Sequence, residues 1–392
     1  MTVDANAVKL FYQEESVYGT VPTSASTSIR YTGESIKPSQ ATTRSEEIDS
    51  LRSTTTIHRV DVGAAGAINT ELILEEHDVL LQYALQAAAV PSAGTATTNA
   101  TGSTANVIND SQFTAANGVN EGVWVFISNV DGTNQVQTGY AKITAFVEAT
   151  SITVEGITIV NTGTMDVTIL GNMVNGSTFK SFTLGKEFTS AAFYGQYPGS
   201  AVAGVTIAGE RGGIITANFD IIGQKATSPN PTALWGTIAA VGSNPPMNSI
   251  DHLENAIEGL NYANRINIIS FSLNIQNALR AQTVMGTLGA TGLGNGSMTV
   301  EGSFTKYFES QTQLDSFLAF TTSSFSVGLQ DELGNLMNIS CPAIKYTDAQ
   351  RVAGGKDTDI IAELSFEAFR NPNGGSGDDD EDIMVMISTF DI

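Results

Sequence analysis

The stretch GGIITANFDIIG, residues 212–223, places an apolar side chain at every second position from Ile215 onward. The stretch DTDIIAELSFEAF, residues 357–369, repeats this pattern from Ile360 onward. Polar residues fill the positions between, which is the period-2 alternation of a strand with one buried face and one face in water. These two similar strands suggest that the chain contains the same unit twice.

A strand followed by a helix also occurs twice. Residues 66–85 and residues 296–320 each begin with alternating apolar residues and continue with apolar residues at helical spacing. Asp78 is the expected N-cap of the first helix, and Thr312 with Asp315 forms the expected capping pattern of the second. The two segments therefore extend the suspected duplication beyond one strand.

Two further pairs of segments follow the same order. Residues 28–36 match residues 266–275 as alternating strands that run into a polar loop. Residues 179–188 match residues 325–344, where a hairpin turn is predicted at 331–335. Four elements recur in the same order, which predicts a duplicated β-rich unit.

The spacing of matched residues predicts an insertion in the first unit. Leu80 and Ile215 lie 135 positions apart, whereas the matching Leu314 and Ile360 lie 46 apart. The first unit therefore carries 89 residues that the second lacks, and they fall between its helix and Ile215.

The inserted segment itself has the composition of a small β-module. Residues 91–106 form a linker rich in Gly, Ser, Thr and Ala. Residues 122–156 and 158–170 contain short apolar runs, with turns expected at 131–132 and 149–150. About five short strands in this length favour a small antiparallel barrel or sandwich.

These patterns predict a mainly β protein with two similar domains, each with a helix after its strand, and an inserted small β-barrel or sandwich module. The expected boundaries are 1–94 and 174–240 for the first domain, 95–173 for the insert and 241–392 for the second domain.

The charge of the chain limits its partners. With 40 acidic and 18 basic residues the formal net charge is −22, and no dense block of Lys and Arg offers a site for phosphates. Tight nucleic-acid binding is not expected. The single Cys341, the N-terminal sequence without a secretion signal and the lack of long apolar runs predict a soluble protein, without a membrane partner, that folds in the cytosol.

Catalytic and metal-binding patterns are weak. His58, His77 and His252 have no His or Cys partner at metal-ligand spacing, and the acids around His77 are more typical of a solvated helix start. The run DDDED at 378–382 lacks the spacing of a calcium loop and favours a solvated turn. We therefore expect no enzyme activity and no cofactor, although two acids that converge in space, as in a glycosidase, leave no mark in the sequence.

Two long polar loops occupy matching positions, at residues 37–66 and 277–296. Connections of this length usually have a function or become ordered by a partner. We expect their charged residues to contact neighbouring subunits; the candidates are Arg44, Glu46, Glu47, Asp49, Arg52, Arg59 and Arg280.

Most of the chain resembles the tail tube proteins, or major tail proteins, of long-tailed bacteriophages. The resemblance rests on the number and order of strand and turn patterns, without a catalytic signature. The segments that carry it are 15–36, 66–85, 180–188, 197–223 and 333–369, together with GVWVFISN and GYAKITAF of the insert.

The resemblance implies a virion protein of the tail, made in the host cytoplasm, whose rings stack into a hollow tube for double-stranded DNA. Each tube domain of that family is a β-sandwich or barrel whose sheet joins its neighbours around the ring. Two such domains per chain imply a homotrimeric ring with pseudo-sixfold symmetry, and a single domain would imply a homohexamer. Tape measure, tail terminator and baseplate proteins are the further implied partners. The alternative is a carbohydrate-binding or adhesive β-rich surface protein.

Overall fold

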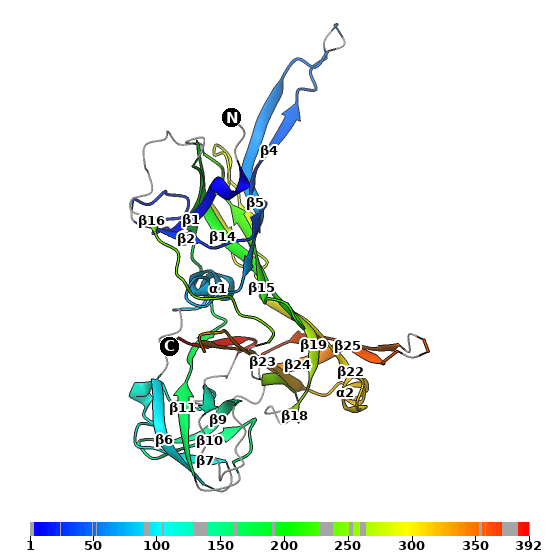
Figure 1. Cartoon of the computed structure of the whole chain (residues 1–392). Helices are drawn as coiled ribbons and strands as arrows, with labels where there is room; N and C mark the ends of the chain where they lie inside the picture. The colour runs from blue at the N-terminus through cyan, green and yellow to red at the C-terminus, as the bar shows by residue number, and fades with distance from the viewer. Residues whose placement is uncertain are drawn as a thin grey trace.

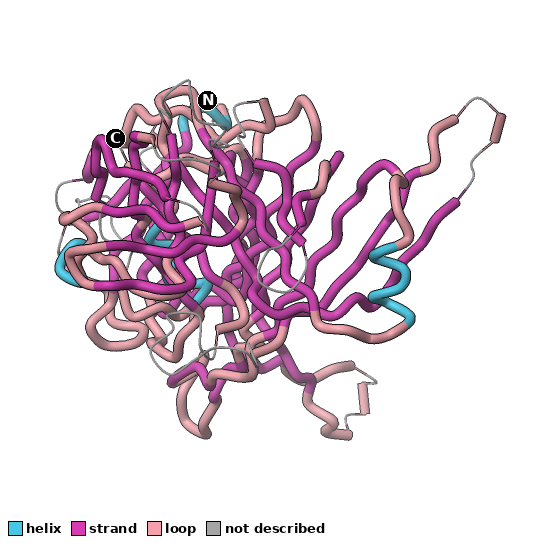
Figure 2. The backbone as a smooth tube through the Cα atoms, turned by 90° about the horizontal axis from the view of Figure 1, so that it is seen from below, coloured by secondary structure: helices cyan, strands magenta, loops and turns pink. Residues whose placement is uncertain are grey.

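The protein is described by a computed structural model in which strands dominate and two short α-helices occur, α1 (Asp78–Leu85) and α2 (Thr312–Leu318). Figure 2 shows how far the strands outweigh the helices. The mainly β fold class is confirmed. The structure describes residues 4–391 apart from 24, 49, 52, 90–94, 104–105, 129–138, 160–162, 190–192, 228–237, 251–253, 259–263, 353–354, 357 and 371–382.

The first unit is an antiparallel sheet that is interrupted in sequence by the insert. Its strands pair in the order β1, β13, β14, β15, β5 and β4, with β2 (Ser26–Ile29) added beside β1 and β3 (Gly33–Glu34) beside β5. The bounds of the six are β1 (Val8–Glu14), β13 (Phe182–Phe188), β14 (Phe193–Glu210), β15 (Thr216–Gly223), β5 (Ile57–Glu71) and β4 (Lys37–Arg44).

The second unit pairs its strands in a matching order: β17, β23, β24, β25, β22 and β19. Their bounds are β17 (Glu254–Glu258), β23 (Ser323–Gln330), β24 (Leu336–Val352), β25 (Ile361–Ala368), β22 (Thr299–Tyr307) and β19 (Ile268–Gln276). Smaller strands are β16 (Ile238–Ala239), β18 (Asn264–Arg265), β20 (Arg280–Gln282) and β21 (Gly292–Gly294).

The two units also match in register. Residues 216–223 of β15 pair with 64–71 of β5, and residues 361–368 of β25 pair with 300–307 of β22. The strand β14 carries a bulge between Val202 and Gly204, and the strand β24 carries one between Tyr346 and Asp348. The two bulges lie opposite equivalent residues of β15 and β25. Bulges bend a strand locally, so the two sheets are expected to bend at the same position.

One core cluster spans both units. The buried residues Ile68 and Phe219 of the first unit and Phe304 and Leu364 of the second belong to it. These residues occupy the apolar positions of the alternating strands, as the sequence predicts. Burial of each such side chain contributes about 1.5–3 kcal/mol. The helix α1 is largely buried against this face, whereas of the α2 residues only Gln313 is fully buried.

The helix starts differ from expectation. The N-cap of α1 is His77 and that of α2 is Gln311, and neither makes a side-chain cap hydrogen bond. Asp78 is a buried residue inside the first turn, because the His77 ring already closes the preceding turn by accepting from the N–H of Ile73 at 3.2 Å. The Thr312 hydroxyl instead accepts from the Ser310 hydroxyl at 3.2 Å. Local side-chain contacts therefore replace the expected caps.

The insert folds as a closed six-stranded barrel in the order β10, β7, β6, β11, β8 and β9. It has a separate apolar core. The expected turn at 149–150 is present, with Ala149 at φ 51°, and the expected turn at 131–132 lies outside the described residues. The strands are β6 (Thr95–Ser103), β7 (Val107–Asn109), β8 (Trp124–Ser128), β9 (Gly139–Val147), β10 (Ser151–Glu155) and β11 (Thr164–Ile169).

The expected loop at 37–66 is for the most part a β-hairpin formed by β4 and β5. It projects from the body at the end opposite the barrel (Figure 1). Its described residues from Lys37 to Val60 are exposed on both faces, apart from the partly buried Ser45, so the sequence shows no apolar alternation there. The prediction of a polar loop is therefore wrong for most of these residues, which are in strands.

The C-terminal strand β26 (Met386–Phe390) pairs with β12 (Gly171–Val174), which directly follows the barrel, on one side and with β24 of the second unit on the other. The acidic run at 378–382 lies outside the described residues. Within the described part of the chain, no helix has the length and apolar character needed to cross a membrane.

Candidate assembly surface

The two units join edge to edge within the chain. Residues 204–210 of β14 pair antiparallel with residues 270–276 of β19. The strand β14 therefore has β13 and β15 as partners in its own unit and β19 as a partner in the other (Figure 1). This junction shows how a strand edge of one unit pairs with a strand edge of the next.

Close packing at the junction depends on two glycines of β14. A Cβ atom at Gly204 would lie 2.4 Å from Oε1 of Gln276. A Cβ atom at Gly209 would lie 2.5 Å from Cδ1 of Ile215 and 2.8 Å from the ring of Phe271. Since real Cβ atoms do not approach so closely, side chains from both units fill the space that these glycines leave.

At the two outer edges of the paired units, the matching strand segments have described pairs on one side. Beyond Ile344, the described pairs of β24 run to β25 on one side. The described pairs of β4 run to β5 on one side. These two edges correspond to the two strands that meet at the internal junction, so the chain ends in one edge of each kind.

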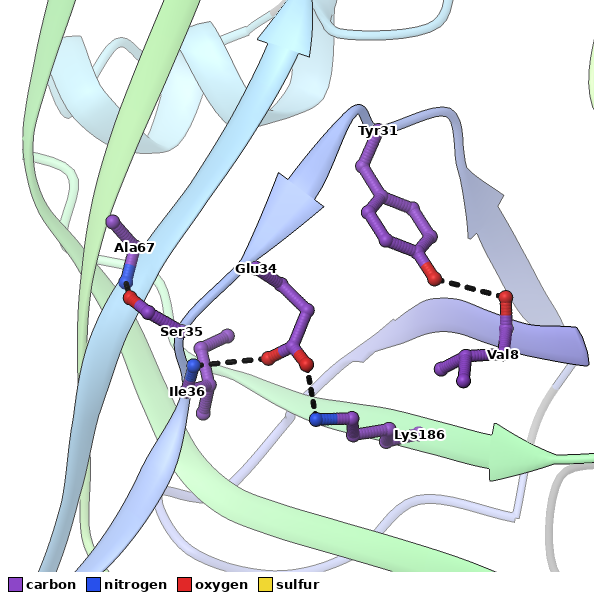
Figure 3. Close-up of polar contacts among 7 residues, drawn as sticks. All are labelled: Val8, Tyr31, Glu34, Ser35, Ile36, Ala67 and Lys186. Atoms are coloured by element: carbon purple, nitrogen blue, oxygen red, sulfur yellow. Dashed lines mark hydrogen bonds and ion pairs between the residues drawn. The ribbon is translucent and has the colours of Figure 1, made fainter. Parts of the chain in front are cut away.

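The free edge at β3 and β4 carries a half-buried ion pair (Figure 3). The Glu34 carboxylate pairs with the Lys186 ammonium, and the two side chains are 15% and 14% exposed. The same carboxylate accepts a hydrogen bond from the N–H of Ile36 at 2.9 Å. Ser35 points the other way and accepts from the N–H of Ala67 on β5 at 2.9 Å. The Glu34 side chain thus satisfies the backbone N–H of Ile36 at this edge of the sheet.

A cavity of about 680 Å³ opens beside this ion pair. The Tyr31 ring lies along it, held by a hydrogen bond from its hydroxyl to the carbonyl of Val8 at 2.8 Å. Burial raises the pKa of Tyr31 above its usual value of 10.0, and the charge of Glu34 adds to this. Lys186 and Phe188 line the other side. The cavity therefore has a mixed lining, in which Val8, Tyr31 and Phe188 lie beside the ion pair and the polar residues Asp4, Asn6 and Thr32.

The sheet face opposite the core is polar and acidic. Glu301 and Glu367 lie directly opposite each other on β22 and β25, an arrangement that destabilises a sheet. Lys37 and Lys345 are in register with the same face. The acidic residues at its positions are Glu71, Glu210, Asp220, Glu301, Asp348, Glu363 and Glu367.

A polar groove of about 420 Å³ crosses this face, with Asn274, Glu301 and Glu367 among its lining residues. Side-chain hydrogen bonds connect neighbouring strands there, such as Asn218 to Asn69 at 2.7 Å and Thr206 to Asn274 at 3.2 Å. A water-facing surface explains why these strands carry Ser, Thr and Asn between their apolar residues.

The second polar loop, 277–296, docks on the first unit. Its Gly289 N–H donates to Asp61 Oδ1 at 3.2 Å, and its Ala290 carbonyl accepts from Gln224 at 2.6 Å. Asn295 exchanges two side-chain hydrogen bonds with Gln86, at 3.3 and 3.0 Å. A loop of one unit thus holds the neighbouring unit in place.

The predicted contact residues fall on the two loops as follows. Arg44, Glu46, Glu47 and Arg59 are exposed on the projecting hairpin, and Arg280 is exposed on β20, where it donates to the carbonyl of Asn295 at 3.4 Å. Asp49 and Arg52 lie outside the described residues. The second loop meets the base of the hairpin at Asp61, whereas the described hydrogen bond of Arg280 stays within its own loop.

Sequence reasoning missed Glu34 and Lys186 as edge residues. Their positions 152 residues apart left no local signal. Their contact follows from the pairing of β1 with β13 and of β3 with β5, which the sequence does not specify.

The expectation of a solvated helix start around His77 was wrong for the histidine itself. His77 is fully buried, and its ring binds the N–H of Ile73 through Nδ1 and the carbonyl of Arg30 through Nε2 at 2.9 Å. Burial lowers the pKa of His77 below 6.5. The neutral ring therefore joins two backbone segments and is a structural residue.

Matched units with one complementary open edge at each end are typical of proteins that assemble through sheet edges into closed rings. The family model described as "Phage tail tube protein" matches residues 5–368. The chain therefore belongs to the phage tail tube protein family, a family of structural proteins of the virion tail. In a comparison with curated proteins, no individual protein matches.

Proposed function

We propose that three chains form a ring with six similar domain positions and that these rings stack into the tail tube. The observation that carries the proposal is the internal junction between β14 and β19. The free edge of β24 and the free edge of β3 and β4 have the matching positions in the fold. A ring of three copies repeats the internal junction three more times and leaves no open edge.

The internal register predicts the contacts between copies. Transferred to the outer strands, it places Asp348 of one copy opposite Ser39 of the next, and Gln350 opposite Lys37. The internal equivalent of the first pair is Gly204 opposite Gln276. The smaller residue is Gly204 on β14 in the internal junction and Ser39 on β4 in the proposed one, so it lies on the opposite strand of the pair. Lys37 would also lie diagonally from Asp348, where opposite charges attract.

The projecting hairpin of the first unit corresponds in the fold to loop 277–296 of the second unit, which docks within the chain. Loop 277–296 binds near Gln86 at the end of α1, and Phe320 holds the equivalent place after α2, with matching φ values of 51° and 52°. Phe320 is 62% exposed, with the Lys345 ammonium 3.8 Å from its ring centre. We assign this place to the hairpin of the next copy, which makes the hairpin charges inter-subunit contacts.

The acidic sheet face is assigned to the channel. Phosphates of passing DNA would meet Glu301, Glu363 and Glu367, which repel them, so that no counterions are released to hold the DNA. Glu301 and Glu367 are directly opposed, and Lys345 opposes Glu367 on β24, so two acids face one cation in this row and its net charge stays negative, which supports a channel role for this face. Low affinity for DNA is the useful property of such a channel.

The proposed domain limits are 1–94 with 174–240, 95–173, and 241–392. The further partners proposed are the tape measure, tail terminator and baseplate proteins that a tail tube meets. A ring of six copies is the alternative, and it would require each chain to supply one domain position.

A cysteine pair tests the ring. Ser39→Cys with Asp348→Cys should form disulfides between copies after assembly, and the covalent ladder on a denaturing gel should stop at three chains. A control pair of Ser39→Cys with Glu148→Cys on the barrel should stay uncoupled. A ladder that ends at six chains, or no coupling in assembled tubes, contradicts the three-chain ring.

A further inference from the structure

Ile215 and Ile360 hold the same position in the two units but differ in burial. The carbonyl of Ile215 accepts from the N–H of Leu72 at 2.8 Å, and the carbonyl of Ile360 accepts from the N–H of Phe308 at 3.0 Å. Ile215 directly precedes the strand β15, and Ile360 directly precedes the strand β25. Ile215 is 1% exposed, whereas Ile360 is 41% exposed. The difference reflects what lies against each residue, because Ile215 is covered by the second unit and by the segment at Met247, whose carbonyl accepts from the N–H of Ile215 at 2.9 Å.

Ile215 is covered by the second unit at the internal junction. The site around it is lined by Ile268 and Phe271 of β19 and by Val327 and Leu329 of β23, and the remaining cavity measures about 250 Å³. The side chain of Ile215 and the Phe271 ring meet beside Gly209. Ile215 of one unit thus lies against apolar residues of its neighbour at this hollow.

The first unit has the matching hollow. Glu34 corresponds to Phe271, because Glu34 lies opposite Ile68 and Phe271 lies opposite the equivalent Phe304. Tyr31 then corresponds to Ile268.

The other wall matches through β13 and β23. Lys186 and Phe188 of β13 correspond to Val327 and Leu329 of β23, since the bulges at Phe182 and Ser323 align the two strands. Tyr31, Glu34, Lys186 and Phe188 all line the open cavity of about 680 Å³.

We propose that Ile360 of one copy inserts into this cavity of the next copy, as Ile215 does within the chain. This inference rests on the proposed ring and names the residue that locks each junction between copies. The occupant is a second copy of this chain, because the internal junction already shows an isoleucine from the preceding unit in the matching hollow.

The open hollow differs from the filled one in polarity. The Glu34 and Lys186 pair replaces Phe271 and Val327, and the Lys186 ammonium lies 5.3 Å from the centre of the Phe188 ring. A charged rim lowers the cost of leaving the hollow in water before assembly. The internal hollow is covered when the chain folds, and at the matching positions it carries the apolar residues Phe271 and Val327.

The test compares two neighbouring isoleucines of similar exposure. Ile360→Asp should abolish rings and tubes, or raise the protein concentration needed for them by at least about 10-fold, since an apolar side chain loses its burial. Ile361→Asp is the control, because Ile361 is 40% exposed on the opposite face of β25. It should assemble within about 2-fold of the unchanged chain. Both monomers should keep the unchanged thermal midpoint.

A cross-linking experiment identifies the residue that Ile360 contacts in the neighbouring copy. Ile360→Cys with Phe188→Cys, treated with a short bis-maleimide, should give covalent chains between copies in assembled rings, and Ile361→Cys with Phe188→Cys should not. Normal tubes from Ile360→Asp, or no cross-link in rings seen by electron microscopy, overturn the inference while the ring stands. If the unchanged chain forms no rings, the proposed function fails and the inference with it.

Discussion

The carboxylate of Glu34 accepts the hydrogen bond of the Ile36 N–H at 2.9 Å, on the open edge of the first sheet. In the internal junction, the matching N–H belongs to Leu273, in the strand that pairs with β14. The free chain thus covers, with its own side chain, a donor that a neighbouring strand is expected to use. Natural proteins protect open sheet edges in such ways to avoid unwanted pairing. Pro38, two residues further along, removes another donor from β4.

Replacement of Glu34 by Gln should lower the stability of the monomer. The change leaves the Lys186 ammonium half-buried without its counter-charge, at a cost of about 1–3 kcal/mol. The measurement is the denaturant midpoint of the unassembled protein. Glu14→Gln is the control, because the Glu14–Lys180 pair at 2.6 Å is 48% and 29% exposed and such surface pairs contribute about 0–1 kcal/mol. Equal midpoint shifts for the two variants would contradict the role given to Glu34.

Stability should fall as the pH rises from about 4 to about 7 because of Asp78. Burial, with the nearby Asp391 charge, raises the pKa of Asp78 from 3.8 to about 7, and burial with Glu75 raises the pKa of Asp391 to about 6. The folded state therefore keeps protons that the unfolded state has released, so the free energy of unfolding decreases with pH in this window.

Asp78→Asn should remove most of this dependence and make the protein more stable at pH 8, by on the order of 2–4 kcal/mol. Thermal midpoints at pH 5 and pH 8 measure it. A variant whose midpoints change with pH as steeply as those of the unchanged protein would show that Asp78 is ionised in the folded state at low cost.

Reversal of the acidic face should make tubes bind DNA. Glu301→Lys, Glu363→Lys and Glu367→Lys together place positive charges where the channel is proposed, and phosphate contacts of this kind weaken as salt increases. Co-sedimentation of double-stranded DNA with tubes across a salt series measures the effect. The matched control reverses the exposed acids Glu309, Asp315 and Glu332 away from this face. Equal DNA binding by both variants would remove the assignment of this face to the channel.

Loss of the hairpin charges should stop tube growth. Replacement of Arg44, Arg52 and Arg59 by Ala together removes the proposed inter-subunit contacts, and the described members are exposed, so the monomer should keep its fold. Electron microscopy and the thermal midpoint of the monomer report on the two properties. Replacement of Lys9 and Lys180, on the body of the first unit, should leave growth unchanged. Normal tubes from the triple variant would exclude the hairpin charges as necessary contacts.

The sequence predicted those parts of the fold that have one buried face. The alternation after Ile215 and Ile360 identified β15 and β25, and the spacing of Leu80 and Ile215 located the inserted barrel. The projecting hairpin was not recognised as strand, because both of its faces are exposed to water and residues such as Thr42 and Arg59 need not alternate with apolar ones.

The assembly surface depends on contacts that are distant in sequence. Glu34 and Lys186 meet only after β1, β3, β5 and β13 have paired. Asp78 has the residue type of an N-cap, but tertiary packing buries it and gives the cap position to His77. The different burial of Ile215 and Ile360 also has no signal in the sequence, since it reflects which unit has a neighbour within the chain.

The mass of single rings in end-on electron micrographs of assembled protein tests the central claim most directly. Three chains of 41.2 kDa, about 124 kDa per ring with six similar lobes around a hollow centre, are the predicted result. Rings of six chains, at twice that mass, would contradict the proposal that one chain supplies two neighbouring positions of the tube.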